Sequence, residues 1–295
     1  MMNRIFSILL LFILFFACSK KRNDGFPTIE TKGPETSISL GKLHLLLGAV
    51  YKIQDEYQDF VMYPDSSIKP EHQRYVTDNG DSIVLSEFNY FIHDLVLFKS
   101  ESDSVSLKDS VFVVKNTSKK RDDLFYLTSI PEGNYIKASF YLGSLNNQTQ
   151  LKSLRSKAPW LFSGIDQYDF FQFKGLYKNK DTALAYPNEP TRIWKTFNWS
   201  ISSTSNSKDQ FKQKINCPLY SPITVKNYSS APYLHIRVNM KAIFGYADQP
   251  SSLIEIKENT IEKFTFQNSI FNKNIFSNDN KGANRMFIND HIHPN

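Results

Sequence analysis

The sequence predicts an all-β domain of the sandwich or barrel kind, and three observations support this prediction. From Leu43 onward, short runs rich in Val, Ile, Phe and Tyr recur, separated by clusters of Asn, Asp, Gly, Ser and Pro. Such a pattern is typical of short strands joined by turns. Aromatic residues make up 14% of the chain, which suits the core of a sandwich. Helical periodicity is weak, and only residues 150–155 and 251–262 could form short helices.

The apolar runs give the positions of the candidate strands. In the run 134–142, residues two apart share a face of an extended chain. The apolar side chains of Ile136, Ala138, Phe140 and Leu142 are therefore expected on one buried face. The candidate strands are residues 43–50, 89–98, 110–114, 135–143, 168–173, 193–202, 233–244 and 263–267.

The N-terminus has the features of a secretory signal peptide, assigned to residues 1–17. Arg4 supplies a positive charge, residues 5–16 are almost wholly apolar, and the small residue Ala17 precedes Cys18. A helix of that apolar run is about 18 Å long, short of the ~30 Å hydrocarbon layer of a bilayer. The run is therefore expected to be a cleaved leader rather than a permanent membrane span.

Cys18 is the predicted site of lipid attachment. The sequence Phe15-Phe16-Ala17-Cys18 resembles a bacterial lipobox, in which the cysteine thiol is acylated before cleavage. The alternative is an ordinary leader with an incidental cysteine. Two or three acyl chains, at ~0.8 kcal/mol per buried methylene, would hold the protein to a membrane. The expected protein is lipid-anchored in the cell envelope, facing the periplasm or the cell surface, with residues 18–38 as a flexible tether and 39–295 as one domain.

The remaining sequence offers no template for catalysis or for nucleic-acid binding. It contains no G-x-S-x-G, P-loop, H-E-x-x-H or dinucleotide-binding motif, so a non-enzymatic protein is expected. The formal charge is +6, and its basic clusters at 20–22 and 119–121 are not interleaved with aromatic residues. Cys217 is the one cysteine besides Cys18, and an inert buried thiol is expected there.

Histidines suggest a metal site. His291 and His293 are two residues apart near the C-terminus, so in an extended chain their side chains point the same way, about 6.6 Å apart at Cα. Imidazoles at that spacing can share a zinc or copper ion. Met286 and Asp290 lie close by in the sequence. The alternative is a polar tail packed on the domain. His44 is predicted on the less apolar face of the first strand.

Six sequence blocks within residues 43–293 carry a family resemblance. They are Leu43-His44-Leu45, Phe88-Asn89-Tyr90-Phe91-Ile92-His93-Asp94-Leu95-Val96-Leu97, Ile130-Pro131-Glu132-Gly133-Asn134-Tyr135, Ala138-Ser139-Phe140-Tyr141-Leu142-Gly143, Tyr168-Asp169-Phe170-Phe171-Gln172-Phe173-Lys174-Gly175, and Asn284-Arg285-Met286-Phe287-Ile288-Asn289-Asp290-His291-Ile292-His293. In this order the blocks resemble the MbnP-like family, which is named for a protein partnered with methanobactin copper acquisition.

This resemblance implies an immunoglobulin-like or related antiparallel β-sandwich with long loops. For some members it also implies copper binding and a dihaem peroxidase-like partner that oxidises a tryptophan to kynurenine. His291 and His293 match the closing motif, and His44 matches the opening strand, so these three are the expected copper ligands. Met286 would favour the reduced ion.

The sequence also departs from the family pattern. Trp160 alone stands near the position of the family's tryptophan pair, and Ser200 stands where the family has histidine. His93 and His235 are expected to be ordinary strand histidines with satisfied hydrogen bonds. The competing hypothesis is a metal-free module that binds a glycan or a protein through exposed aromatic residues, namely Tyr177, Tyr186, Trp194 or Trp199.

Overall fold

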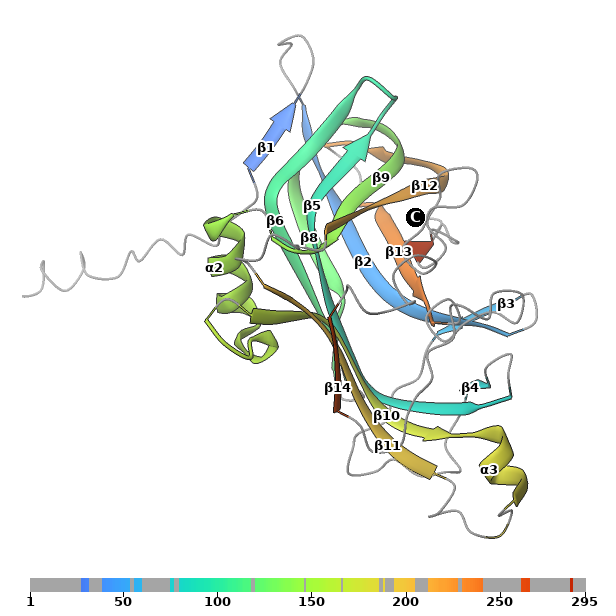
Figure 1. The fold of residues 1–295 in the computed structure, drawn as a ribbon. Coiled ribbons are helices and arrows are strands. Elements are labelled where there is room, and N and C mark those ends of the chain that lie inside the picture. Colours follow the sequence, from blue (N-terminus) through green and yellow to red (C-terminus); the bar gives the residue numbers. More distant parts are fainter. Residues whose placement is uncertain are drawn as a thin grey trace, which may run out of the picture.

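The structure is a computed structural model in which mainly antiparallel strands form two sheets with few helices. The predicted all-β sandwich class is thereby confirmed (Figure 1). Each candidate strand predicted from the sequence overlaps a strand of the structure. The structure describes residues 28–31, 39–53, 56–59, 75–76, 80–117, 120–145, 147–165, 167–185, 188, 194–204, 212–227, 230–240, 261–265 and 287–288.

The larger sheet, sheet A, has ten strands. Six of them follow one another in the order β1 (Thr28–Thr31), β6 (Ser104–Thr117), β5 (Ser82–Phe98), β10 (Gln167–Lys178), β11 (Trp194–Thr204) and β14 (Ile261–Thr265). The other four are β4 (Tyr75–Val76) and β9 (Gly133–Gly143), which pair with β5, β12 (Lys212–Val225), which pairs with β9, and β7 (Lys120–Asp122), which pairs with β6. Strand β1 falls within the stretch expected to be the tether.

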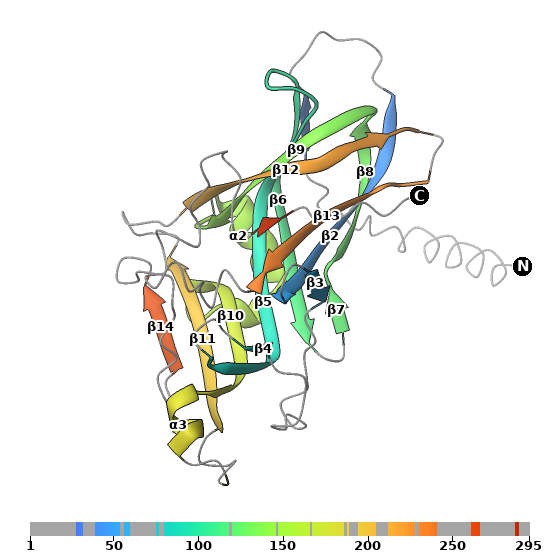
Figure 2. The ribbon, with the colours of Figure 1, turned by 90° about the vertical axis from the view of Figure 1, so that its right-hand side faces the viewer.

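The smaller sheet, sheet B, has five strands (Figure 2). Its order is β15 (Phe287–Ile288), β13 (Tyr233–Asn239), β2 (Leu40–Ile53) and β3 (Glu56–Asp59). Strand β8 (Leu124–Pro131) pairs with β2 on the same edge as β3, opposite β13. Two pairs are parallel, β13 with β2 and β11 with β14. All other pairs of named strands in the described chain are antiparallel.

Strand β5 is shared by two halves of sheet A. Its N-terminal part pairs with β10 and its C-terminal part with β9, while β6 runs along its other edge. In Figure 1, β9 and β12 accordingly lie above, and β10 and β11 below. The register changes at Asp94, whose φ of 51° is positive. This bulge turns the strand from one set of partners to the other.

The core lies between the sheets and follows the two-residue period of the strands. Leu43, Leu45 and Leu47 of β2 are at most 1% exposed. They lie on the apolar face of this strand, opposite the face predicted for His44. On β5, Tyr90 is fully buried and its hydroxyl donates to the Leu47 carbonyl at 3.3 Å. One face of β5 therefore points toward sheet B, and the alternate residues point away from it.

The prediction for β9 is confirmed at Ala138, Phe140 and Leu142, which are buried, and is wrong at Ile136, which is 41% exposed. Tyr135 is buried instead. The partner strand β12 has a register shift between Pro218 and Ile223, opposite this part of β9. Such a bulge bends the pair and changes which residues face the core.

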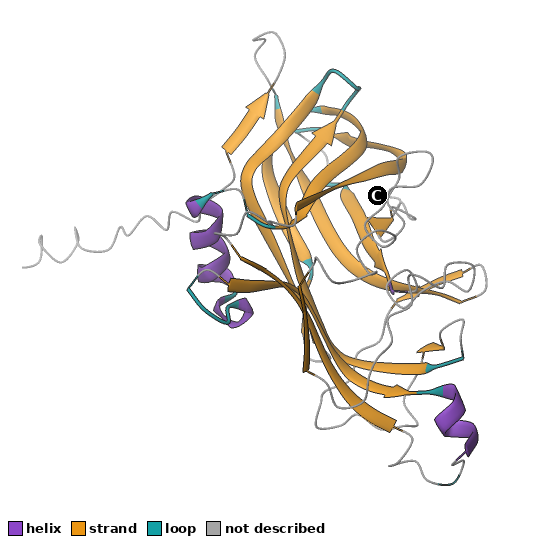
Figure 3. Cartoon of the chain, in the orientation of Figure 1, coloured by secondary structure: helices purple, strands orange, loops and turns teal. Residues whose placement is uncertain are grey.

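Helix α2 (Gln148–Lys157) confirms the predicted helix at 150–155. The side chain of Asn147 caps it by accepting from the Gln150 backbone N–H at 3.0 Å. The short 3₁₀ helix η2 (Pro159–Leu161) follows directly, and α3 (Lys180–Ala185) lies at the far end of β10 (Figure 3). Of the other predicted helix, 251–262, only residues 261 and 262 are described, and they belong to β14. No helix among the described residues is long and apolar enough to cross a bilayer.

Candidate functional site

Polar side chains form two rows across sheet A, on the face that points away from sheet B. In the first row, Asn89 of β5 is paired with Lys115 of β6 on one side and with Gln172 of β10 on the other. Gln172 is in turn paired with Ser200 of β11. The second row runs Glu87, Lys174, Asn198 in the same order of strands.

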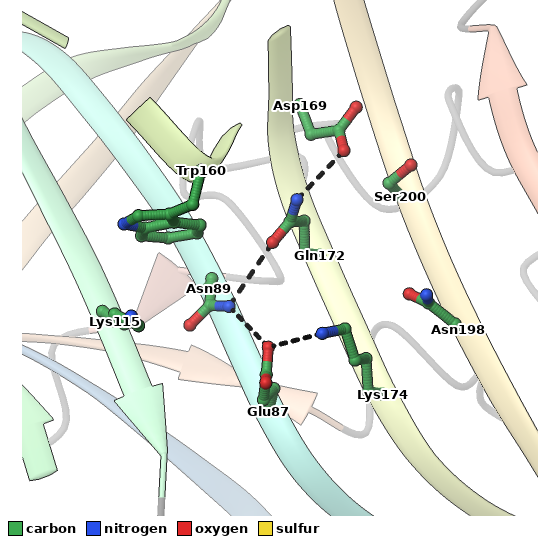
Figure 4. Close-up of a pocket in the computed structure, with 9 residues that line it drawn as sticks. All are labelled: Glu87, Asn89, Lys115, Trp160, Asp169, Gln172, Lys174, Asn198 and Ser200. Carbon is green, nitrogen blue, oxygen red and sulfur yellow. Dashed lines mark hydrogen bonds and ion pairs between the residues drawn. The ribbon is translucent and has the colours of Figure 1, made fainter. Parts of the chain in front are cut away.

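These rows form the floor of a pocket of about 350 Å³. Trp160, carried by η2, stands at its side, and Asp169 of β10 closes the end (Figure 4). The ammonium of Lys115 lies 5.0 Å from the centre of the Trp160 ring, a cation–π contact. The sequence places η2 here because α2, which directly precedes it, is packed against sheet A through the buried Leu151 and Leu154.

Hydrogen bonds link the floor residues into a chain that has a carboxylate at each end. Gln172 donates from Nε2 to Asp169 at 3.0 Å, and Asn89 donates from Nδ2 to Gln172 Oε1 at 3.5 Å and to Glu87 at 3.2 Å. Because ionised carboxylates only accept, the two ends fix which way both amides are turned. Figure 4 shows this chain, with the Asn89 oxygen on the side facing Lys115.

The Asn89 oxygen Oδ1 is an unsatisfied buried acceptor. Asn89 is 1% exposed, and this oxygen has no hydrogen-bond partner among the described residues. Leaving a buried polar atom without a partner costs about 1–3 kcal/mol. Buried polar groups are usually satisfied by protein or by ordered water, so this oxygen marks a place where a water molecule or a ligand hydroxyl can donate a hydrogen bond.

The charges around the pocket are already engaged. Glu87 forms an ion pair with Lys174 at 3.1 Å. Asp169 accepts from Ser202 at 2.6 Å in addition to Gln172. No group of three His, Cys, Asp or Glu side chains that could hold a metal ion occurs in the described part of the chain. The pocket, with its amides and engaged carboxylates, does not have the imidazole or thiolate donors that copper prefers.

His44 lies on the face of sheet B that points away from the core, as predicted. Its ring is flanked by the rings of Tyr126 on β8 and Tyr233 on β13, each with its centroid 4.8 Å away and in edge-on geometry. The nitrogen Nδ1 is buried and has no hydrogen-bond partner among the residues that the structure describes. His291, His293, Met286 and Cys18 lie outside the described residues.

His93 is the buried strand histidine that was predicted, but the expectation that its hydrogen bonds are satisfied is wrong for one nitrogen, because Nε2 has no hydrogen-bond partner among the described residues. It is fully buried, and its Nδ1 lies 3.1 Å from a carboxylate oxygen of Asp94. Burial lowers the pKa of His93, and Asp94 opposes this only in part. Burial alone would raise the pKa of Asp94, but hydrogen bonds from His93 and Gln150 and from the backbone of Asp109 lower it overall. His235 is 3% exposed.

The other residues considered from the sequence divide into two groups. Tyr177 and Trp194 are 9% and 8% exposed, so the prediction that they are exposed contact residues is wrong; they pack into the sheet. The side chains of Tyr186 and Trp199 lie outside the described part of the structure. Cys217 is buried, and burial raises the pKa of its thiol, which agrees with the inert thiol predicted there.

Together, the two sheets and the pocket define an all-β domain of the sandwich class. The chain belongs to the MbnP family, whose sequence model matches residues 58–266. No curated protein and no solved structure matches the chain. The match includes Trp160 and Ser200, and both line the pocket. His44, His291 and His293 lie outside the matched range.

Proposed function

We propose that this protein is a non-enzymatic binding module held at an envelope membrane by a lipid on Cys18, and that it binds copper through His44, His291 and His293. The MbnP family match fits a binding domain. The observation that supports the metal site is the buried Nδ1 of His44, which has no hydrogen-bond partner in the described chain. In the tautomer that has its proton on Nε2, a ring nitrogen without a hydrogen-bond partner has its lone pair free for a metal ion.

The order of strands in sheet B supports the proposed ligand set. β15 is paired with β13, and β13 with β2, which carries His44. Because β15 is antiparallel to β13, it runs from the partner of Val238 to the partner of Arg237, in the direction of Tyr233, the residue paired with His44. Tyr233 is about 13 Å along the strand from Arg237. An extended chain from Ile288 to His293 spans up to about 17 Å, so the reach is sufficient.

Copper binding by His44, His291 and His293 requires a particular path of the chain after Ile288. Ile288 is paired with Arg237, which shares the face of His44, whereas Phe287 is paired with Val238 on the core face. A regular continuation of this ladder would turn His291 and His293 to the core face. Copper binding with His44 therefore requires the chain to leave the ladder after Ile288, the last residue of β15.

Copper titration of the mature protein against a competing chelator tests the metal site. We expect His44→Ala and the His291→Ala/His293→Ala double variant each to lower copper affinity at least tenfold. His72→Ala is the matched control, because it removes an imidazole that the proposed site does not use. Equal affinities for the wild type and the double variant would refute the copper proposal.

Labelling cells with an alkyne-bearing fatty acid tests the anchor separately. The wild-type protein should take up the label and sediment with membranes, whereas Cys18→Ala should do neither. Cys217→Ala should behave like the wild type, because its thiol is buried in the domain. Wild-type protein recovered from cells with an unmodified Cys18 would contradict the anchoring proposal and leave the copper proposal standing.

A further inference from the structure

We infer that the polar pocket of sheet A is a second binding site, and that its ligand is a neutral saccharide. A sugar ring would lie with its C–H face against Trp160 and donate a hydroxyl hydrogen to Oδ1 of Asn89. This site is independent of the proposed copper site, because its floor is on sheet A and His44 is on sheet B.

The two carboxylates of the pocket fix the direction of the hydrogen bonds along its floor. Asp169 and Glu87 can only accept, so Gln172 and Asn89 must turn their NH₂ groups toward them. The acceptor oxygen of Asn89 is thereby left without a partner in the described chain, at the floor of the pocket. A ligand that fits must bring an O–H or N–H donor to this atom.

The pocket has no net formal charge. Its lining contains two carboxylates, Glu87 and Asp169, and two ammonium groups, Lys115 and Lys174. The formal charges cancel, and both carboxylates already accept hydrogen bonds from neighbouring side chains. A cationic ligand would find no free carboxylate, and the pocket offers no excess charge to attract an anion.

The other groups that line the pocket are amides, a hydroxyl and one aromatic ring, and these suit a sugar. Asn89, Gln172, Asn198 and Ser200 carry amides and a hydroxyl, groups that pair well with ligand hydroxyls because these both donate and accept. Trp160 adds an apolar ring at the side of the pocket. The Lys115 ammonium now occupies the space over that ring, but the residue is exposed and its stem is flexible, so a sugar ring can take its place.

The position of the pocket favours a saccharide over a peptide. Peptides that bind to sheets commonly add a strand to a free edge. The pocket floor lies on β5, β6, β10 and β11, and the central strands β5 and β10 are paired on both sides along this stretch. Their backbone groups are already used, so recognition depends on side chains alone.

Binding of four neutral disaccharides to the mature protein tests this inference. Maltose, cellobiose, lactose and N,N′-diacetylchitobiose would each be titrated while tryptophan fluorescence and saturation-transfer NMR are recorded. We expect at least one to bind, and we expect Trp160→Ala and Asn89→Leu each to lower its affinity at least tenfold. Tyr220→Ala removes an exposed aromatic ring that does not line the pocket, so it should leave the affinity unchanged and serves as the matched control.

Circular dichroism of each variant shows whether it is folded. Trp160 is only partly buried, whereas Asn89 is 1% exposed, so Trp160→Ala keeps the test decisive if Asn89→Leu fails to fold. Absence of binding by all four sugars would overturn the inference. So would binding that both variants leave intact, or a clear preference for a charged sugar or a peptide. None of these outcomes affects the copper titration.

Discussion

The two faces of β5 and β10 are made from alternate residues of the same strands, yet one face is aromatic and the other is polar and charged. On one face, the rings of Phe88, Tyr90, Phe171 and Phe173 stack with centroids 4.9 to 5.9 Å apart. On the other lie the amides and charges of the pocket floor. Burial of the aromatic rings stabilises the folded state. This stabilisation offsets the free-energy cost of the unsatisfied Asn89 oxygen on the polar face.

Removing a ring from the aromatic face should have the largest effect. Phe171 is 1% exposed and contacts three of the other rings of this face, so we expect Phe171→Ala to lower the free energy of unfolding by about 3–5 kcal/mol. Its neighbour Gln172 points to the polar face, and Gln172→Ala should cost about 1 kcal/mol. Urea unfolding measures both. Equal losses would mean that the two faces do not differ in this way.

The close approach of β10 to β5 gives a second, smaller effect. A Cβ added at Gly175 would lie 2.0 Å from the carbonyl oxygen of Val84, a backbone atom that cannot move aside alone. Gly175→Ala should therefore destabilise the protein by about 1–3 kcal/mol. Gly164→Ala is the control, because its nearest neighbour would be the Gln167 Cβ at 3.8 Å. A Gly175→Ala variant as stable as the control would contradict the tight packing of these strands.

Farther along β5, the pair formed by His93 and Asp94 should make stability depend on pH. The Asp94 carboxylate also accepts a hydrogen bond from Gln150 of α2 at 2.7 Å. Because burial lowers the pKa of His93, the unfolded chain binds its proton more readily than the folded one. Stability should therefore fall as the pH drops below about 6.5, the ordinary value for histidine. The lowered pKa of Asp94 adds a further loss at more acidic pH, as the folded carboxylate becomes protonated.

Thermal unfolding between pH 8 and 4 measures this effect. We expect His93→Gln to be less stable at neutral pH but to lose less stability between pH 7 and 5 than the wild type. Parallel pH profiles for the two proteins would show that His93 is not the group responsible. Because α2 leads directly into η2, the loss should be accompanied by a change in Trp160 fluorescence.

The two-residue period of the strands predicts which residues face the core in regular strands. It does not predict the residues at or opposite a bulge. The core faces of β2 and most of β9 follow from the alternation of Leu43, Leu45 and Leu47 and of Ala138, Phe140 and Leu142. Ile136 was mispredicted because its burial depends on a bulge in a different strand. Strand β12 was missed because its prolines, Pro218 and Pro222, argue against a strand and in fact border or lie within that bulge.

The pocket was missed for a related reason. Phe171-Gln172-Phe173-Lys174 already shows alternation of aromatic and polar residues, and so does Glu87-Phe88-Asn89-Tyr90. What the sequence does not contain is the register that sets Asn89 beside Gln172, or the helix that brings Trp160 to their side. At the proposed metal site, the strand and face of His44 were predicted correctly, but its tyrosine neighbours come from two strands distant in sequence.

The shared strand β5 also has a consequence for how the molecule comes apart. Its backbone is hydrogen-bonded to β6 along one side and to β10 and then β9 along the other. Separating the half of sheet A that contains β10 from the half that contains β9 would break this central ladder, so these two halves should melt together in one cooperative transition. The amides near the middle of β5 should then exchange with deuterium more slowly than those of β4 or β7, each of which pairs with one other strand of the described chain.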